Sequence, residues 1–312
     1  MPSTNHQPRD IYQEVTDRIV AALETGVAPW VRPWRPMYAA NDFPRNGLTG
    51  RPYHGINVFL LWLTANACGY RSQDWFTFNQ AKQKGAHVRK GERGTLVTFW
   101  KLLRVRDDAA EAGTDRTKKI PLLRHFIVFN RDQLDGLPAV KADPAPQRPE
   151  WERDEAVETF VRASGARIIE GGSHAAYSPG RDEIYMPPLA DFVTREAYYS
   201  TELHELTHWT GHGSRMNRDL SGGFGSESYA REELVAEMGA AFLCAALGVQ
   251  GQLQHPEYIG NWIQVLKGDK KAVFRAASEA RQVAEYLGAT PPAAGQTEED
   301  EGEGAAELPE AA

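Results

Sequence analysis

The sequence His204-Glu205-Leu206-Thr207-His208 lies inside a helical pattern that spans residues 195–211. On a helix, residues i and i+4 share one face, so both imidazoles can reach one cation while Glu205 stands beside them. Two neutral imidazoles, one carboxylate and one open position suit Zn²⁺, and Mn²⁺ or Co²⁺ would accept the same ligands. Such an ion lowers the pKa of a water molecule, and Glu205 is the candidate general base for its proton. The segment therefore predicts a catalytic metal site.

A catalytic metal site needs a third protein ligand, and the next helical pattern, residues 229–247, offers three carboxylates. Glu233 and Glu237 are again i and i+4, and small residues continue their face, which permits close packing against the first helix. An ordinary acidic face usually carries lysines at that spacing, and this one has none. From the residues alone, the third ligand stays open among Glu232, Glu233 and Glu237.

The two helices together resemble thermolysin-like enzymes, in which a Glu-x-x-x-Asp pair follows the His-Glu-x-x-His helix. The resemblance implies that Glu233 is the third ligand and that Glu237, which stands where Asp is usual, hydrogen-bonds His204.

His212 is a second candidate near the predicted cleft. Residues 208–212 are similar to the metzincin extension, but the position that this family requires for its third histidine is Ser214 here. His212 is therefore expected in a loop near the cleft, where it would hold the oxyanion or the helix end, or would have a plain surface role. Tyrosines are further oxyanion candidates, namely Tyr177, Tyr198 and Tyr258.

The composition is that of a globular protein without a membrane span. The 312 residues are 41% hydrophobic and 25% charged, which predicts about two domains and enough apolar material for two cores. No apolar run reaches the length of a membrane helix, so no membrane partner is expected. The two cysteines, Cys68 and Cys244, exclude a disulfide framework and favour a cytoplasmic location.

The charge is divided unevenly between the two halves. Residues 1–142 carry 21 Lys and Arg against 13 Asp and Glu, whereas residues 143–312 carry 14 against 29. Such asymmetry is typical of a module that binds a polyanion joined to a different domain.

Tryptophans and cations alternate in the basic half, as they do in sites for single-stranded nucleic acid, where cations follow the phosphates and rings stack on bases. The alternative is that the rings form a core and the cations its solvated face. Residues 82–93 are a candidate clamp on the backbone. The candidate nucleic-acid contacts are Trp30, Arg32, Trp34, Arg35, Arg45, Arg51, Tyr53, Lys82, Lys84, Arg89, Lys90 and Arg93.

Periodicity and breakers predict an α+β organisation. Helices are expected over residues 9–25, 56–68, 152–163, 195–211, 229–247 and 270–287, with a short helix after a capping box at residues 77–80. Strands are expected over residues 95–105, 123–130, 166–170 and 182–186. The predicted domains are a small basic α+β domain that binds single-stranded DNA (1–142), a linker (143–149), a metallopeptidase domain (150–287) and a disordered acidic tail (288–312).

With these motifs in place, residues 8–287 are similar to ArdC-type antirestriction proteins of conjugative plasmids. In the first half, the similarity rests on the opening helix through residues 29–30 and on residues 53–57, 75–81 and 90–94. In the second half, it rests on residues 182–187, 198–199, 204–212 and 232–237. It implies an N-terminal domain that binds single-stranded DNA, a C-terminal zincin-like metallopeptidase domain, and protection of incoming DNA from restriction. His204, His208 and Glu233 then correspond to ligands and Glu205 to the catalytic acid/base.

Two other functions compete with this one. In the first, the protein coats single-stranded DNA and its metal is structural; Glu205 argues against it, since a structural site needs no general base. In the second, a housekeeping protease uses the basic half to recruit an acidic protein substrate.

Overall fold

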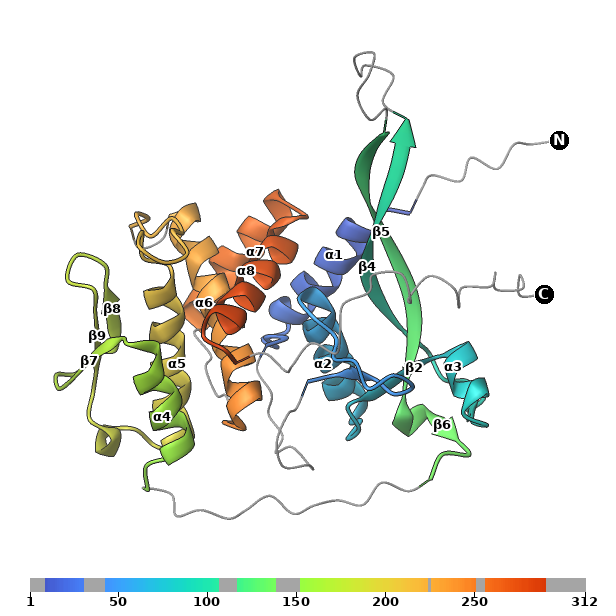
Figure 1. Ribbon diagram of the computed structural model, residues 1–312, viewed down its shortest axis with the longest axis horizontal. Helices are drawn as coiled ribbons and strands as arrows, with labels where there is room; N and C mark the ends of the chain where they lie inside the picture. The colour runs from blue at the N-terminus through green and yellow to red at the C-terminus, as the bar shows by residue number, and fades with distance from the viewer. Residues whose placement is uncertain are drawn as a thin grey trace.

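The structure is a computed structural model that describes residues 9–30, 43–106, 117–138, 152–223, 226–250 and 256–289. The predicted linker, the tail beyond residue 289, and the candidate contacts Arg32, Trp34 and Arg35 lie outside these residues. Helices and sheets are both present, as the α+β prediction requires (Figure 1).

A four-stranded sheet with the order β1-β2-β5-β4 organises the first half of the chain. β4 and β5 form a long antiparallel hairpin, and β3 pairs with β6 in a separate ribbon. The elements are α1 (Ile11–Glu24), β1 (Arg45–Asn46), α2 (Ile56–Cys68), β2 (Asp74–Thr77), α3 (Phe78–Gln83), β3 (His87–Val88), β4 (Thr95–Arg106), β5 (Thr117–Asn130), a 3-10 turn (Arg131–Gln133) and β6 (Leu134–Asp135).

Local sequence signals account for several of these elements. The Thr77 side chain accepts a hydrogen bond from the Gln80 backbone N–H while the Gln80 side chain reaches back to Thr77, which confirms the predicted capping box. Gly69 ends α2 in the left-handed conformation. Asn57, on α2, accepts a 2.7 Å hydrogen bond from the Thr98 backbone N–H and donates a 2.5 Å one to the Thr98 carbonyl. These two bonds tie α2 to β4 at the free edge of the sheet.

The second half places a small sheet beside a helical layer. The three strands have the order β7-β9-β8, so β8 is an edge strand. In the described part of the chain, no helix has both the length and the apolar character that a bilayer crossing requires. The elements are α4 (Glu155–Ser164), β7 (Arg167–Glu170), β8 (Ala176–Ser178), β9 (Glu183–Met186), a 3-10 turn (Leu189–Asp191), α5 (Arg195–Thr210), α6 (Glu227–Leu247), α7 (Pro256–Gly268) and α8 (Ala272–Tyr286).

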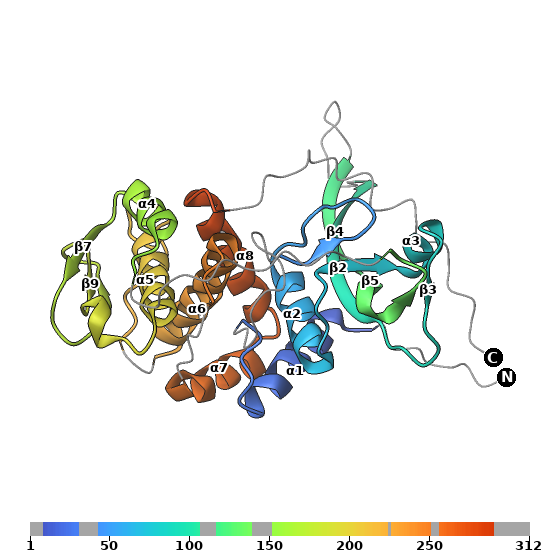
Figure 2. The same ribbon diagram turned by 90° about the horizontal axis from the view of Figure 1, so that it is seen from below.

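The largest hydrophobic cluster joins the two halves, whereas the composition had suggested enough apolar material for a core in each, and two smaller clusters lie within the first half. Phe59 of α2 stacks on Phe242 of α6, with ring centroids 4.8 Å apart and an interplanar angle of 13°. Trp30 meets Trp262 of α7 edge to face at 5.4 Å. α1 packs against α7 and α2 against α8, as Figure 2 shows. The physical reason is that α2 is apolar on several sides and α1 has one apolar face, so the small sheet alone cannot cover both helices, and the C-terminal helices complete their burial.

The contact between α5 and α6 depends on a glycine. A Cβ atom on Gly239 would lie 2.5 Å from Cγ2 and 2.9 Å from Oγ1 of Thr207. Thr207 is fully buried, and its hydroxyl donates a 2.9 Å hydrogen bond to the Leu203 carbonyl, so it cannot easily move away. The two helices are therefore held at a spacing that only glycine allows.

We expect Gly239→Ala to destabilise the protein by about 1–3 kcal/mol, because overpacking of α5 against α6 outweighs the better helix propensity of alanine. Gly260→Ala is the matched control, since Gly260 lies in α7 with nothing within 4 Å of its Cβ position, and it should be neutral or stabilising. Urea unfolding of both variants makes the comparison. Equal midpoints for Gly239→Ala and the wild type would show that the helices tolerate a wider spacing.

Candidate functional site

α5 carries both histidines of the predicted metal site into the protein interior. The helix begins after Thr194, whose side chain accepts a hydrogen bond from the Ala197 backbone N–H. Most of its length is buried, including His204, which is 4% exposed. The i, i+4 spacing places His204 and His208 side by side, with their Nε2 atoms 3.2 Å apart.

Glu233 of α6 completes a compact group of three donors. Its Oε2 atom lies 3.4 Å from His204 Nε2, and its Oε1 atom lies 3.5 Å from His208 Nε2. One ligand atom from each residue lies within 4.8 Å of the other two. Of the three carboxylates that the sequence left open, the structure thus brings Glu233 to the histidines. Two imidazoles and a carboxylate in a buried pocket are a donor set that fits Zn²⁺ or another first-row divalent ion.

The histidines and the neighbouring carboxylates stabilise each other's charged forms. Burial lowers the pKa of the His208 imidazole, but hydrogen bonds to Glu232 and Glu233 outweigh burial and raise it to about 10. Burial raises the pKa of the Glu233 carboxyl, but its contacts with His204 and His208 lower it far below its usual range. The Glu233 carboxylate therefore stays charged in the interior.

Glu232 orients His208 from the side opposite to the donor group. Its Oε1 atom lies 3.1 Å from His208 Nδ1, and Arg218 holds both of its oxygens with bonds of 2.8 and 2.9 Å. Arg218 also donates to the Thr207 carbonyl at 2.7 Å. This arrangement fixes the ring so that Nε2 faces His204 and Glu233. The sequence had marked Glu232 only as an alternative ligand; Arg218, in a loop after α5, carried no signal.

We expect Glu232→Gln to lower the affinity for Mn²⁺ or Zn²⁺ by about 10–100-fold, since the charged acceptor that orients His208 is lost. Glu227→Gln, an exposed change on the same helix, is the control and should leave the affinity unchanged. Calorimetric titration with each metal chloride measures both, and circular dichroism checks folding. An unaltered affinity in Glu232→Gln would mean that the ring is oriented by other contacts.

The edge strand β8 fixes the predicted general base. The Tyr177 backbone N–H donates a 2.7 Å hydrogen bond to Glu205 Oε2, and the Glu205 residue is 8% exposed. The carboxylate therefore has a defined position one residue after His204. The bond from Tyr177 engages Oε2, and the other carboxylate oxygen, Oε1, can accept a proton.

Two of the residues predicted as oxyanion candidates, Tyr177 and His212, make hydrogen bonds to other side chains. The Tyr177 hydroxyl donates to Asp182 at 2.9 Å and accepts from Arg215 at 3.2 Å, and burial together with Asp182 raises its pKa to about 12. His212 is half-buried in the loop after α5, and its Nδ1 atom lies 2.8 Å from the Ser214 hydroxyl. No role in holding an oxyanion follows from these contacts.

The other candidates around the metal site remain predictions. The Tyr198 hydroxyl donates toward Glu170 and Glu202, whereas the Tyr258 hydroxyl lies 3.0 Å from that of Tyr229, a neighbour of Glu233. Glu237 is 1% exposed on α6, one turn after Glu233. Its predicted bond to His204 stays a prediction.

Trp30 is the clearest correction among the nucleic-acid candidates. It is 4% exposed and packs against Phe59 and Trp262, so it is not available to stack on a base. The sequence suggested a surface role because proline and arginine flank it. Its partner Trp262 comes from the distant α7, which sequence reasoning did not place beside it.

The predicted cations fall into two groups. Some are engaged by acids: Arg45 pairs with Asp74 at 2.6 Å, and Arg89 pairs with Glu92 at 2.9 Å. All five cations of the predicted clamp are exposed, and those other than Arg89 are Lys82, Lys84, Lys90 and Arg93. Arg51 and Tyr53 instead line a groove of about 1680 Å³ that the sequence had not outlined.

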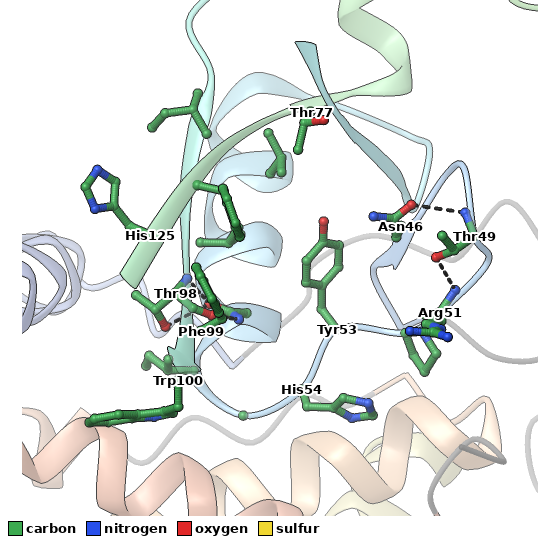
Figure 3. Close-up of a pocket in the computed structure, with 18 of the residues that line it drawn as sticks. Asn46, Thr49, Arg51, Tyr53, His54, Thr77, Thr98, Phe99, Trp100 and His125 are labelled. Atoms are coloured by element: carbon green, nitrogen blue, oxygen red, sulfur yellow. Dashed lines mark hydrogen bonds between the residues drawn. The ribbon is translucent and has the colours of Figure 1, made fainter. Parts of the chain in front are cut away.

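This groove lies between the N-terminal sheet and the C-terminal helices. Figure 3 shows Tyr53 and Phe99 pointing into it from opposite sides, with Trp100 and His54 toward the C-terminal helices. Phe99 stacks on Phe126 across β4 and β5, with centroids 4.5 Å apart. Two further rings are largely exposed, Phe78 (55%) and Trp100 (52%). Within the described residues, the lining contains four Lys or Arg and no Asp or Glu: the cations are Arg51, Lys271, Arg275 and Arg281.

Comparison with known families and proteins gives consistent results for both halves. Residues 9–129 match the N-terminal domain of anti-restriction factor ArdC, and residues 155–279 match a zincin-like metallopeptidase domain. Uncharacterized protein y4eC of Sinorhizobium fredii is 40% identical over 289 residues, which cover 91% of this chain and 93% of that protein. Two DNA primase TraC proteins of Escherichia coli are 38% and 37% identical over 91% and 89% of this chain, which spans only 20% and 27% of their length.

Solved structures extend the similarity to three dimensions. The metal-free structure of the antirestriction ArdC protein from the R388 plasmid is 42% identical, with a TM-score of 0.77, and the match covers 90% of this chain and 97% of that one. The Mn(II)-bound structure of the same protein is 40% identical, with a TM-score of 0.74 and the same coverage.

Proposed function

Because this chain belongs to the ArdC antirestriction family, we propose that it binds single-stranded DNA and protects incoming plasmid DNA from host restriction, and that it carries a divalent metal site of the metallopeptidase type. This role would be carried out in the cytoplasm of the cell that receives the DNA.

The observation that carries the DNA part of the proposal is the groove with aromatic and cationic lining and without acids in the described residues. Cations neutralise phosphates, and rings accept bases by stacking irrespective of sequence. A duplex keeps its bases paired and could not reach the rings inside the groove, so single strands are the better fit. Candidates outside the groove, such as Lys82, Lys84, Lys90 and Arg93, would extend the contact along the backbone.

The metal part rests on the group His204, His208 and Glu233, which would hold the ion. Zn²⁺ is the proposed ion, and Mn²⁺, present in a structure of the R388 protein, is the alternative together with Co²⁺. When bound, the ion supplies Lewis-acid activation of a carbonyl and of water. Glu205, held by the Tyr177 backbone N–H, would accept the proton of that water and pass it to a leaving amine.

The alternative proposal is that coating of single-stranded DNA suffices for protection and that hydrolysis is not needed. A protein substrate would be a second partner under the first proposal and would be absent under the alternative. A housekeeping protease that recruits an acidic protein through its basic half would prefer that protein over DNA.

Binding and protection are tested together. The full chain is titrated against fluorescein-labelled oligo(dT), the corresponding duplex and an acidic protein over a range of NaCl concentrations. Transfer of a conjugative plasmid into restricting and non-restricting recipients is then compared with and without the protein. We expect preference for oligo(dT), a marked salt dependence, and higher transfer only into the restricting recipient. Absence of oligo(dT) binding would overturn the DNA part, and unchanged transfer would overturn the antirestriction role.

A further inference from the structure

The groove has one wall from each half of the protein. β4, β5, α3 and the segment around Tyr53 form the first wall, and α8, the last helix of the metallopeptidase half, forms the second. Three of the four Lys and Arg residues in the described lining belong to this second wall: the N-cap residue of α8, Lys271, and two residues of the helix, Arg275 and Arg281. Sequence analysis had assigned DNA contacts only to the N-terminal half.

Resting on the proposed function, we propose that α8 is a DNA-binding element, so that the path of the single strand is formed jointly by both halves. Its cations would contact the phosphates while the rings of the opposite wall receive the bases. The metallopeptidase half would then contribute directly to DNA affinity.

The two faces of α8 are suited to two tasks. One face is small and apolar and packs on α6: the buried residues include Val273, Ala276, Ala277 and Ala280. The other face lines the groove, and its residues recur at helical spacing: Lys271, Phe274, Arg275, Ser278 and Arg281. Because the first face is anchored in the shared core, the second is held in a fixed position relative to the sheet.

Contacts across the end of the groove join the two walls. The Tyr12 ring of α1 lies 4.9 Å from Phe274 of α8 and 6.0 Å from Trp100 of β4. The Lys271 ammonium lies 5.1 Å from the centroid of Tyr12. His54 lines the groove together with Arg281 of α8, and burial and the charge of Arg281 both lower the pKa of His54. The walls are therefore in contact rather than separated by a hinge.

The acids that neighbour the α8 arginines leave them accessible to a phosphate. Arg275 pairs with Asp269 and Arg281 with Glu285, and neither acid lines the groove. Both arginines are partly exposed, and ion pairs of this kind add little stability, so the guanidinium groups can exchange a carboxylate for a phosphate.

The test uses the full chain and a variant with Lys271→Gln, Arg275→Gln and Arg281→Gln together. The matched control, Arg162→Gln, Arg167→Gln and Lys267→Gln, removes the same charges from ion-paired surface positions outside the groove. Affinity for oligo(dT) is measured by fluorescence anisotropy at several NaCl concentrations. We expect the α8 variant to lose roughly tenfold or more in affinity and about 2 in the slope of log K against log salt, at about 0.7 for each phosphate contact. The control should match the wild type.

Ser278→Lys provides a second measurement that does not depend on removing contacts. It adds a cation to the groove face of α8 and should raise both the affinity and the salt slope, the latter by about 0.7. If the wild type binds oligo(dT) while the triple variant and Ser278→Lys both match it, the role of α8 is overturned and the proposed function stands. If the wild type itself does not bind, both are overturned.

Discussion

Replacing Glu205 by glutamine is expected to slow metal-dependent peptide hydrolysis by about 10²–10⁴-fold, because the amide cannot accept the proton of the attacking water. Metal affinity should stay near that of the wild type, since Glu205 is not one of the three donors. Glutamine keeps an oxygen that can accept the Tyr177 N–H, so the local fold is preserved. Hydrolysis is measured on a quenched-fluorescent peptide library with Zn²⁺ or Mn²⁺, and metal affinity by calorimetry.

Glu196→Gln, a partly exposed change on the same helix, is the control and should hydrolyse peptides like the wild type. Equal hydrolysis by Glu205→Gln would remove Glu205 from the mechanism. Restriction protection by the same variant separates the two proposals. Loss of protection with intact oligo(dT) binding favours hydrolysis as the function, whereas full protection favours coating.

Removing the exposed rings of the groove, with Phe78→Ala and Trp100→Ala combined, is expected to weaken oligo(dT) binding by about 1–3 kcal/mol for each base that loses its stacking partner. Both side chains are more than half exposed, so the free energy of unfolding should change little. The slope of log K against log salt should stay constant, because no charge is removed. Anisotropy titrations at several salt concentrations measure affinity and slope together.

Tyr286→Ala is the control for this prediction, because Tyr286 is an equally exposed ring of α8 that does not line the groove. It should bind oligo(dT) like the wild type. If the double variant and the control are indistinguishable, the rings of the groove do not stack on bases. A fall in salt slope without loss of affinity at high salt would instead indicate that the rings only position the cations.

Short-range patterns predicted much of what the structure contains. The pairing of His204 with His208 follows from helical periodicity within one segment, and the capping box at Thr77 depends on residues three apart, whereas periodicity left the third carboxylate open among Glu232, Glu233 and Glu237. Alternation predicted strands over residues 95–105 and 123–130, which fall within β4 and β5, but not their pairing as a hairpin. α7 was missed because it follows a stretch rich in glycine and glutamine, and β8 because three residues carry too little periodicity.

Contacts between residues far apart in the chain could not be predicted in the same way. Trp30 has flanks typical of a surface residue, and it is buried by packing against Phe59 of α2 and Trp262 of α7. Glu232 differs from its neighbour Glu233 by one helical position, about 100° of rotation. Its carboxylate contacts His208 Nδ1 and is held there by Arg218, a residue that no local pattern places beside it. The groove combines residues from Tyr12 to Arg281, and no local signal indicates that α8 faces the sheet.

The shared core has a consequence for how this protein can be rearranged in evolution. A cut between the halves would expose Trp30 and Phe59 on one fragment and Phe242 and Trp262 on the other, and large apolar patches of that kind promote aggregation. The halves should therefore be inherited and fused as a single cassette. The matches to the much longer TraC primases fit this expectation, since 91% and 89% of the present chain recur there as one continuous region. A recombination event that moves His204, His208 and Glu233 into another gene would therefore be expected to bring the groove residues of the first half with them.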